Sequence, residues 1–229
     1  MCYNGKNFRR RGARMKKYPF ILFDLDGTLT YSHPGIYESL RYALASLGRP
    51  DPDESRLRMC VGPPLVYSFS EVFGLSADEV PVAVRKYRER YADVGWRENE
   101  PIPGAYEALK TLKGRGYRLA LATSKPEIYA RRISDAFGFT SFFDALTGSG
   151  VDGSLPLKSD VIREVLRRLG ASEGLSLMVG DRKQDAEGAR ACGVAFAGLA
   201  VGYAEPGELE AEHPDYLFRG FGELLDFLG

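Results

Sequence analysis

The sequence predicts an α/β fold, with a Rossmann-like parallel-sheet core and an inserted all-helical domain. Short apolar runs typical of buried strands alternate with helical patterns, which implies right-handed crossovers and a parallel sheet with helices on both faces. Between residues 33 and 100 this alternation stops, and several helical patterns follow one another without a convincing strand. We therefore expect a core formed by residues 18–32 and 101–229, and a helical domain formed by residues 33–100.

Four apolar runs are the expected strands of the core, and four helical patterns accompany them. The runs are short and nearly continuous, as in strands that are buried on both faces. The expected strands are Phe20–Phe23, Tyr117–Ala122, Leu175–Val179 and a weaker one at Val194–Leu199. The expected helices are Pro103–Gly114, Pro126–Phe137, Ser159–Leu169 and Arg182–Cys192.

The inserted segment has the apolar spacing of a small helical bundle. One stripe follows the i, i+4, i+7, i+11 spacing of a helix face, and Ser76–Glu79 resembles a capping box before it. This stripe consists of Val80, Val84, Tyr87 and Tyr91, and a second one of Ile36, Leu40, Tyr42, Ala43 and Leu47. We interpret such stripes as core packing rather than as ligand contacts.

Composition and charge exclude several classes of protein. Hydrophobic residues make up 44% of the 229 residues and charged residues 27%, which is ordinary globular usage and excludes wholesale disorder. Lys and Arg number 31, as do Asp and Glu, so the chain lacks the basic excess of a dedicated nucleic-acid binder. No apolar run approaches the roughly 18 residues of a membrane span. We therefore expect neither nucleic-acid nor membrane partners.

Cysteine and histidine usage narrows the chemistry further. The three cysteines are odd in number, far apart and without a C-x-x-C pair, which argues against a disulfide framework and a zinc site and favours a reducing cytoplasm. With two histidines in the chain, a His-rich metal site or a Ser-His-Asp triad is disfavoured. Catalysis must therefore come from carboxylates, lysines and hydroxyls.

Residues 1–17 form a basic leader, which we expect to be disordered. The first 18 residues carry seven Lys or Arg and no acidic residue, without the apolar segment of a signal peptide. The alternative is a basic arm for nucleic acid or an anionic membrane. Met15 precedes Lys16–Pro19 and an apolar strand, so we hypothesise that translation begins at Met15.

Two acidic residues follow the first expected strand directly. Asp24 and Asp26 are two residues apart, so they point to the same side if the chain stays extended. Parallel sheets bind ligands at the carboxyl ends of their strands, and two carboxylates there form a hard, oxygen-rich site suited to Mg²⁺. Gly27 permits the tight turn that exposes both acids. An apolar strand followed by D-x-D-G-T therefore indicates a functional site.

The next two strands also end in polar groups. Thr123 and Ser124 end the second, where a hydroxyl and the free N–H groups of the following helix would face an anion. Asp181 and Asp185 follow the third, one helical turn apart on one face. Lys158, taken alone, is typical of a surface lysine at a helix start. Three successive strands each place polar groups at one edge of the sheet. A contribution to folding stability alone does not explain this convergence, so it indicates a functional site.

These motifs resemble those of the haloacid dehalogenase superfamily, over nearly the whole chain from Tyr18 onward. The four motifs of that family match, in the family's order, Asp24–Thr28, Thr123, Lys158 and Gly180–Asp185. The resemblance implies that family's fold, with a helical cap inserted after the first motif. Three further strings are similar to the phosphoglycolate phosphatase and 5′-nucleotidase-like branch, namely Val61–Leu65, Leu121–Pro126 and Gly153–Ser154.

The chain departs from the relatives' pattern at two positions. Tyr31 stands where many relatives have Asp, at the hinge into the cap. Ser159 stands where many relatives have Pro after the motif lysine, which separates the chain from the commonest phosphoglycolate phosphatase pattern.

The resemblance implies a phosphatase mechanism. Asp24 attacks phosphorus and forms an aspartyl-phosphate, while Asp26 protonates the leaving oxygen and later takes a proton from the attacking water. The implied Mg²⁺ ligands are Asp24, the Asp26 carbonyl and Asp181, with Asp185 behind them. The implied phosphate-binding groups are Thr123, Ser124 and Lys158.

The cap must read the part of the substrate beyond the phosphoryl group. The expected reader is the segment from Arg58 to Leu65, in which Gly62 and Pro63 begin a stiff turn aimed at the core. Arg58 would bind the carboxylate of phosphoglycolate. A nucleoside monophosphate would instead need an apolar or aromatic wall, for which the sequence offers Val61, Leu65, Tyr67 and Phe69. Both substrates stay open.

The function that we predict is a Mg²⁺-dependent phosphomonoesterase acting on a small phosphorylated metabolite. A sugar phosphomutase of the same fold is an alternative, disfavoured because its usual motif has Val at the position of Thr28. A catalytically inactive phosphate-binding protein is another, disfavoured because every catalytic position is filled. The sequence leaves monomer and homodimer both open.

Overall fold

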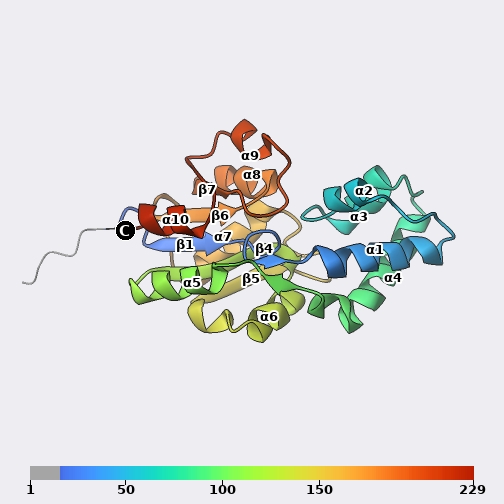
Figure 1. The fold of residues 1–229 in the computed structure, drawn as a ribbon, viewed down its shortest axis with the longest axis horizontal. Coiled ribbons are helices and arrows are strands. Elements are labelled where there is room, and N and C mark those ends of the chain that lie inside the picture. The colour runs from blue at the N-terminus through green and yellow to red at the C-terminus, as the bar shows by residue number, and fades with distance from the viewer. Residues whose placement is uncertain (1–15) are drawn as a thin grey trace, which may run out of the picture.

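The computed structural model describes residues 16–229 as an α/β unit with a helical unit at one end (Figure 1). The predicted leader and the start at Met15 fall outside this range, apart from Lys16 and Lys17. Within it, no helix is both long enough and apolar enough to cross a bilayer.

A six-stranded sheet, parallel throughout, forms the centre of the α/β unit. The strand order is β5-β4-β1-β6-β7-β8, so the first strand lies between two strands from distant parts of the chain. The strands are β1 (Phe20–Phe23), β4 (Arg118–Pro126), β5 (Ala145–Ser149), β6 (Ser176–Gly180), β7 (Ala195–Leu199) and β8 (Tyr216–Phe218). Their carboxyl ends face the helical unit (Figure 1).

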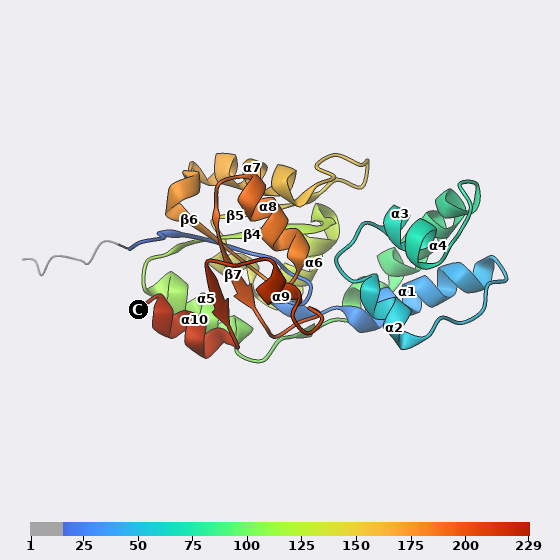
Figure 2. The ribbon, with the colours of Figure 1, turned by 90° about the horizontal axis from the view of Figure 1, so that it is seen from above.

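Helices cover both faces of this sheet, which confirms the predicted three-layer core (Figure 2). On one face, Ile21 and Phe23 of β1 pack with α5 (Ala105–Gly114), α6 (Glu127–Ala136) and α10 (Phe221–Phe227). On the other, Leu22 packs with α7 (Lys158–Leu169) and α8 (Lys183–Ala191), near which lies the short α9 (Glu208–Ala211). Because β1 is buried on both faces, its sequence is apolar without alternation.

The edge strands and one helix start differ from the prediction. The analysis of the sequence missed β5 and β8, because Ala145–Ser149 is weakly apolar and Tyr216–Phe218 is only three residues long. It also placed Pro126 inside a helix. Instead, β4 continues to Pro126, and α6 begins at Glu127.

The helical unit, residues 33–99, is an insertion with a hydrophobic core of its own. It contains α1 (His33–Ser46), α2 (Glu54–Met59), α3 (Leu65–Tyr67), a π-helical turn at Ser68–Val72, α4 (Glu79–Asp93) and a 3₁₀ turn at Gly95–Arg97. Leu40, Leu57 and Phe69 are fully buried in that core. Val80, Tyr87 and Tyr91 of the predicted stripe on α4 are buried with them, and Val84 is half-buried against the same core. Tyr42, which the prediction placed in the apolar stripe of α1, does not pack in this core. It is exposed, and its hydroxyl donates to Glu89.

The predicted capping box before α4 is confirmed. The Ser76 amide donates to the Glu79 carboxylate at 2.9 Å, and the Glu79 amide donates to the Ser76 hydroxyl at 3.4 Å. These two bonds satisfy donors that the first turn of a helix leaves free.

Two short linkers connect the insertion to the core. They pair as antiparallel strands β2 (Thr30–Tyr31) and β3 (Glu100–Pro101), so the two linkers lie side by side. Tyr203, in the loop after β7, places its hydroxyl oxygen 2.7 Å from the amide of Ser32 and 2.9 Å from that of His33. A core residue thus accepts the free donors at the start of α1, which fixes where the insertion begins.

Close backbone contact between α1 and the 3₁₀ turn predicts a sensitive glycine. A Cβ on Gly35 would lie 2.0 Å from the Gly95 carbonyl oxygen, so Gly35→Ala must push two backbone segments apart. We expect it to lower the free energy of unfolding by about 1–3 kcal/mol in urea titrations. Gly114→Ala is the matched control, since nothing lies within 4 Å of its added Cβ, and it should leave stability unchanged or slightly raised. Equal stability of both variants would contradict this close contact.

Candidate active site

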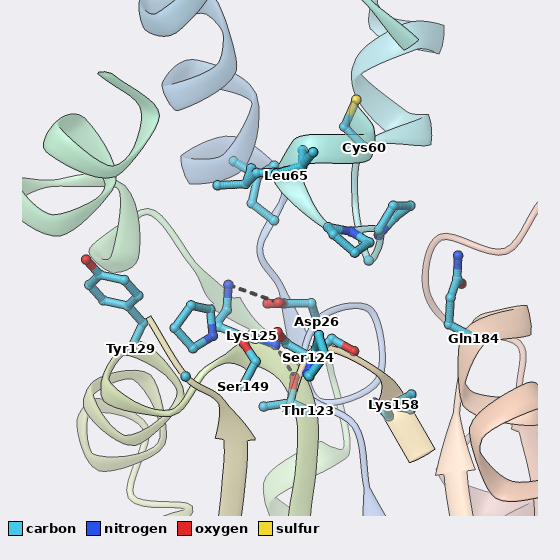
Figure 3. Close-up of a pocket in the computed structure, with 18 of the residues that line it drawn as sticks. Asp26, Cys60, Leu65, Thr123, Ser124, Lys125, Tyr129, Ser149, Lys158 and Gln184 are labelled. Carbon is cyan, nitrogen blue, oxygen red and sulfur yellow. Dashed lines mark hydrogen bonds and ion pairs between the residues drawn. The ribbon is translucent and has the colours of Figure 1, made fainter. Parts of the chain in front are cut away.

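A cavity of about 350 Å³ lies between the carboxyl ends of the core strands and the helical insertion. Its floor includes Asp24, Asp26, Thr123 and Lys158 of the core, and its opposite wall comes from the insertion. Figure 3 shows Leu65 of the insertion above these core groups. The structure therefore brings the polar ends of β1, β4 and β6 to one place.

Three buried carboxylates meet beside β1. Asp24 follows this strand, and its amide donates to the Val179 carbonyl of β6 at 3.0 Å, which continues the sheet pairing by one residue. One carboxylate oxygen from each of Asp24, Asp181 and Asp185 lies within 4.8 Å of the others. Each of these residues is less than 9% exposed. This cluster concentrates negative charge where water is largely excluded.

Lys158 compensates part of this charge. Its Nζ lies 2.7 Å from Asp24 Oδ1 and 2.6 Å from Asp185 Oδ1. Burial alone would lower the pKa of the ammonium, but attraction by Asp185 and Asp24 raises it to about 12. Lys158 is therefore a buried cation at the first residue of α7 and not a surface lysine, which its position in the sequence alone did not reveal.

Asp181 and Asp185 retain an excess of negative charge. Burial, and then repulsion by Asp185, raises the pKa of Asp181 well above its usual value. Burial also raises the pKa of Asp185 to about 6, despite the opposing attraction of Lys158. Asp181 accepts hydrogen bonds from the Thr28 hydroxyl at 3.1 Å and the Tyr203 amide at 2.7 Å. A divalent cation would supply the missing positive charge, and the carboxylate oxygens suit a hard cation.

Glycines allow the backbone to approach this cluster closely. A Cβ on Gly27, whose φ is +83°, would lie 2.2 Å from Asp181 Oδ2, and one on Gly202 would lie 2.3 Å from the same oxygen. The predicted role of Gly27 in a tight turn thus has a second reason, because a side chain would displace the carboxylate.

Asp26 lies apart from the three-carboxylate cluster, with a lysine of its own. Its Oδ2 lies 2.9 Å from Lys125 Nζ, and Lys125 also donates to the Tyr91 hydroxyl at 2.7 Å. Burial lowers the pKa of Lys125, but Asp26, Tyr91 and Tyr87 together outweigh it and raise the pKa above its usual value. The analysis of the sequence missed Lys125. The sequence did contain a signal for it. Residues two apart in a strand point to the same side, and β4 extends through both Thr123 and Lys125.

Thr123 and Ser124 line the cavity as predicted, but from a strand end. Thr123 is 1% exposed, and its hydroxyl accepts from the Lys125 amide at 3.2 Å. The Ser149 hydroxyl donates to the Ser124 carbonyl at 2.7 Å and ties the ends of β4 and β5 together. The first turn of α6 begins after this segment.

The residues predicted to read the substrate divide into two groups. Gly62, Pro63 and Leu65 line the cavity. Arg58 lies outside the cavity lining, because α2 directs its guanidinium to Glu205 of the core, 2.9 Å away. Of the proposed apolar wall, Val61 and Phe69 are instead buried in the insertion core, and Tyr67 is 50% exposed and outside the lining.

The wall of the cavity comes from residues that the analysis of the sequence had assigned to packing or overlooked. Tyr87 and Tyr91 of α4 and Tyr129 of α6 contribute aromatic rings. Arg88 is the charged residue that the insertion contributes to the lining. The apolar stripe on α4 located this face, but the spacing of a buried stripe does not reveal which of its members border a cavity.

Comparison with known proteins accounts for this arrangement. The sequence profile of the haloacid dehalogenase-like hydrolases matches residues 21–199. The chain belongs to this family. The predicted family, its fold and the prediction of a phosphatase are thereby confirmed.

Three proteins illustrate what the chain is similar to. A 5′-nucleotidase of Pseudomonas aeruginosa is 42% identical over 93% of this chain and 96% of its own. Tyrosine-protein kinase PtkA of Mycobacterium tuberculosis is 39% identical over 85% of this chain and 66% of its own. The crystal structure of a predicted phosphatase from Clostridium acetobutylicum is 36% identical and superimposes with a TM-score of 0.87, covering 92% of this chain and 98% of that chain.

The buried ion pairs of Lys158 predict a large effect on stability. Lys158→Met would leave Asp24 and Asp185 without their buried cation, so we expect a loss of about 3–5 kcal/mol in the free energy of unfolding, measured in urea with EDTA. Lys113→Met is the control, because it removes the more exposed pair with Asp144 and should cost less than about 1 kcal/mol. Similar losses in the two variants would show that Lys158 is not needed to compensate the cluster.

Proposed function

We propose that this protein is a Mg²⁺-dependent phosphomonoesterase that works through an aspartyl-phosphate. The observation that carries the proposal is the convergence of Asp24, Asp185 and Lys158 at the floor of one cavity, with Asp181 buried beside them. A carboxylate that attacks a phosphate ester needs neighbouring positive charge, because nucleophile and substrate are both anionic. Lys158 supplies one such charge, and the carboxylate cluster is suited to hold another.

The residues divide the reaction into two steps. Asp24 forms a bond from a carboxylate oxygen to phosphorus, while the bond to the ester oxygen breaks. Asp26 gives its proton to that leaving oxygen, and in the second step it takes a proton from the water that attacks the aspartyl-phosphate. The released products are an alcohol and inorganic phosphate. Thr123, Ser124 and Lys158 bind the phosphoryl oxygens throughout.

Asp24, Asp181, Asp185 and the backbone carbonyl of Asp26 are the residues that would hold Mg²⁺. The ion, when bound, neutralises charge on the phosphoryl oxygens. Support comes from the raised pKa values of Asp181 and Asp185, which reflect burial first and then repulsion by neighbouring carboxylates. The hydrogen bonds from Thr28 and the Tyr203 amide hold Asp181 in place for such an ion.

The cavity favours a 5′-nucleotidase-like substrate over phosphoglycolate. Tyr129 gives the wall an aromatic face on which a flat base can pack, and Leu65 adds an apolar contact. A two-carbon acid would leave this surface uncovered. The similarity to a protein named 5′-nucleotidase points the same way.

We further propose that the protein acts in the cytoplasm, as a monomer or homodimer. Cys60 and Cys192 are free thiols, as expected in a reducing compartment. A small, diffusible phosphate ester is the only partner that this activity requires.

The assigned nucleophile is tested by Asp24→Asn. We expect hydrolysis of p-nitrophenyl phosphate with Mg²⁺ to fall to background, because an amide is a far poorer nucleophile than a carboxylate. Asp51→Asn changes an exposed residue paired with Arg41 and should retain full activity. Activity retained by Asp24→Asn would exclude the aspartyl-phosphate, and wild-type protein inactive on a panel of phosphate esters would favour the binding-protein alternative.

The metal site is tested by thermal unfolding. Mg²⁺ at about a hundred times its Kd should raise the Tm of the wild type by roughly 5–10 °C relative to EDTA. Asp181→Asn should lose most of this rise, because one of the crowded carboxylates is gone. The same variant should melt no lower than wild type in EDTA, since it relieves repulsion. An unchanged rise in Asp181→Asn would remove this residue from the metal site.

The substrate class is tested by kcat/KM for phosphoglycolate and a set of nucleoside 5′-monophosphates. Tyr129→Leu removes an aromatic face, so we expect it to lower kcat/KM for nucleotides by roughly tenfold or more. Arg58→Ala is the control and should leave kcat/KM unchanged for both substrate classes, because its guanidinium contacts Glu205 outside the cavity lining. If phosphoglycolate is preferred and Arg88→Ala abolishes that preference, the nucleotidase-like assignment is wrong.

A further inference from the structure

A chain of three side chains crosses from the helical insertion to the predicted acid-base residue. The Tyr91 hydroxyl, on α4, accepts from Lys125 Nζ at 2.7 Å, and Lys125 Nζ lies 2.9 Å from Asp26 Oδ2. We propose that Tyr91 is a positioning residue: acting through Lys125, it orients Asp26 for proton transfer when the insertion lies on the core. This inference rests on the proposed function, because it assumes that Asp26 protonates the leaving oxygen.

The two carboxylate oxygens of Asp26 have different surroundings. Oδ2 is paired with Lys125, whereas Oδ1 is buried and has no hydrogen-bond partner among residues 16–229. A buried polar atom without a partner is costly and calls for an explanation. Asp26 lines the cavity, so a leaving-group oxygen is the partner that the reaction would provide. Fixing Oδ2 sets the rotation of the carboxyl group and thereby the direction of Oδ1.

Lys125 can hold Asp26 only if its own ammonium is held. A lysine ammonium stands on a flexible four-carbon chain and its three donors rotate freely, so its position depends on the groups that it contacts. Here the side chain is 5% exposed, and the two contacts of Nζ lie on opposite sides of the boundary between core and insertion. Removing the Tyr91 hydroxyl would leave Nζ with its ion pair to Asp26 and its contact with the face of the Tyr91 ring, 4.8 Å from the centroid, but without its hydrogen bond to the insertion. The carboxyl group would then follow the motion of the lysine.

Tyr91 itself is rigid enough to serve as a reference point. It is 2% exposed, its ring stacks on Tyr87 at 5.5 Å with an interplanar angle of 9°, and it meets the Tyr129 ring edge-on at 5.2 Å. Tyr91 belongs to the insertion, while Lys125 and Asp26 belong to the core. Any movement of the insertion about its two linkers would therefore break the contact between Tyr91 and Lys125. Alignment of Asp26 is in this way coupled to closure over the substrate.

Leaving-group dependence separates a positioning role from a packing role. An alkyl phosphate needs protonation of its leaving oxygen, whereas p-nitrophenolate leaves readily without it. We expect Tyr91→Phe to lower kcat for an alkyl phosphate by about tenfold or more, with little change in KM, and to lower kcat for p-nitrophenyl phosphate by less than about twofold. The substitution retains the ring and its packing, so urea unfolding should remain close to wild type.

Two further variants complete the test. Tyr42→Phe removes another tyrosine hydroxyl bond of the insertion, to Glu89 at 2.7 Å, between two residues outside the cavity lining, and should leave both rates unchanged. Lys125→Gln should show the selective loss of Tyr91→Phe, and it tests the chain independently if Tyr91→Phe proves unstable. In an Asp26→Asn background, adding Tyr91→Phe should have no further effect on the alkyl phosphate.

The outcomes discriminate between this inference and the proposed function. Equal losses on both esters, or full additivity with Asp26→Asn, would overturn the positioning role while leaving the phosphatase assignment intact. Wild-type protein that hydrolyses neither ester would overturn the proposed function and this inference with it. A selective, non-additive loss on the alkyl phosphate is the result expected of a chain that acts through Asp26.

Discussion

Repulsion among three buried carboxylates is the constraint on which the architecture of the site depends. Asp24, Asp181 and Asp185 are held together although all three are buried and like charges repel. Backbone amides, a threonine hydroxyl and Lys158 hold them, and glycines leave room for them. Tyr203 extends this support, because its amide binds Asp181 while its hydroxyl accepts from the start of α1. The same residue therefore connects the acidic cluster to the linker of the insertion.

Two acids separated by one residue acquire different chemistry from different lysines. Asp24 shares Lys158 with Asp185 inside the acidic cluster, whereas Asp26 pairs with Lys125 at the boundary with the insertion. Neighbouring carboxylates can take up separate roles when their environments differ in this way. The acidic cluster is built by residues of the core. The surroundings of Asp26 are built jointly, since Tyr91 of the insertion contacts Lys125 of the core.

The sequence predicted the core and the polar floor of the site because both follow from local rules. A strand buried on both faces must be apolar, and parallel strands bring their carboxyl ends to one edge, so Asp24, Thr123 and Asp181 could be placed together. The direction of Arg58 could not be predicted, since it depends on how α2 sits against the core. The contribution of Arg88 depends likewise on the docking of α4. Spacing identifies a buried helix face, but tertiary packing decides which side chains border a cavity.

The position of β1 in the sheet has a consequence for biosynthesis. This strand leaves the ribosome before its neighbours, yet Phe20 pairs with Arg118 on one side and with Ser176 on the other. The nascent chain must therefore carry an apolar strand with two open edges while most of the protein is still being made, a state prone to aggregation. The insertion that follows β1 has a core of its own, made from contacts within residues 33–99 apart from Tyr203 and Tyr129. It can collapse first and separate this strand from later segments until β4 and β6 emerge.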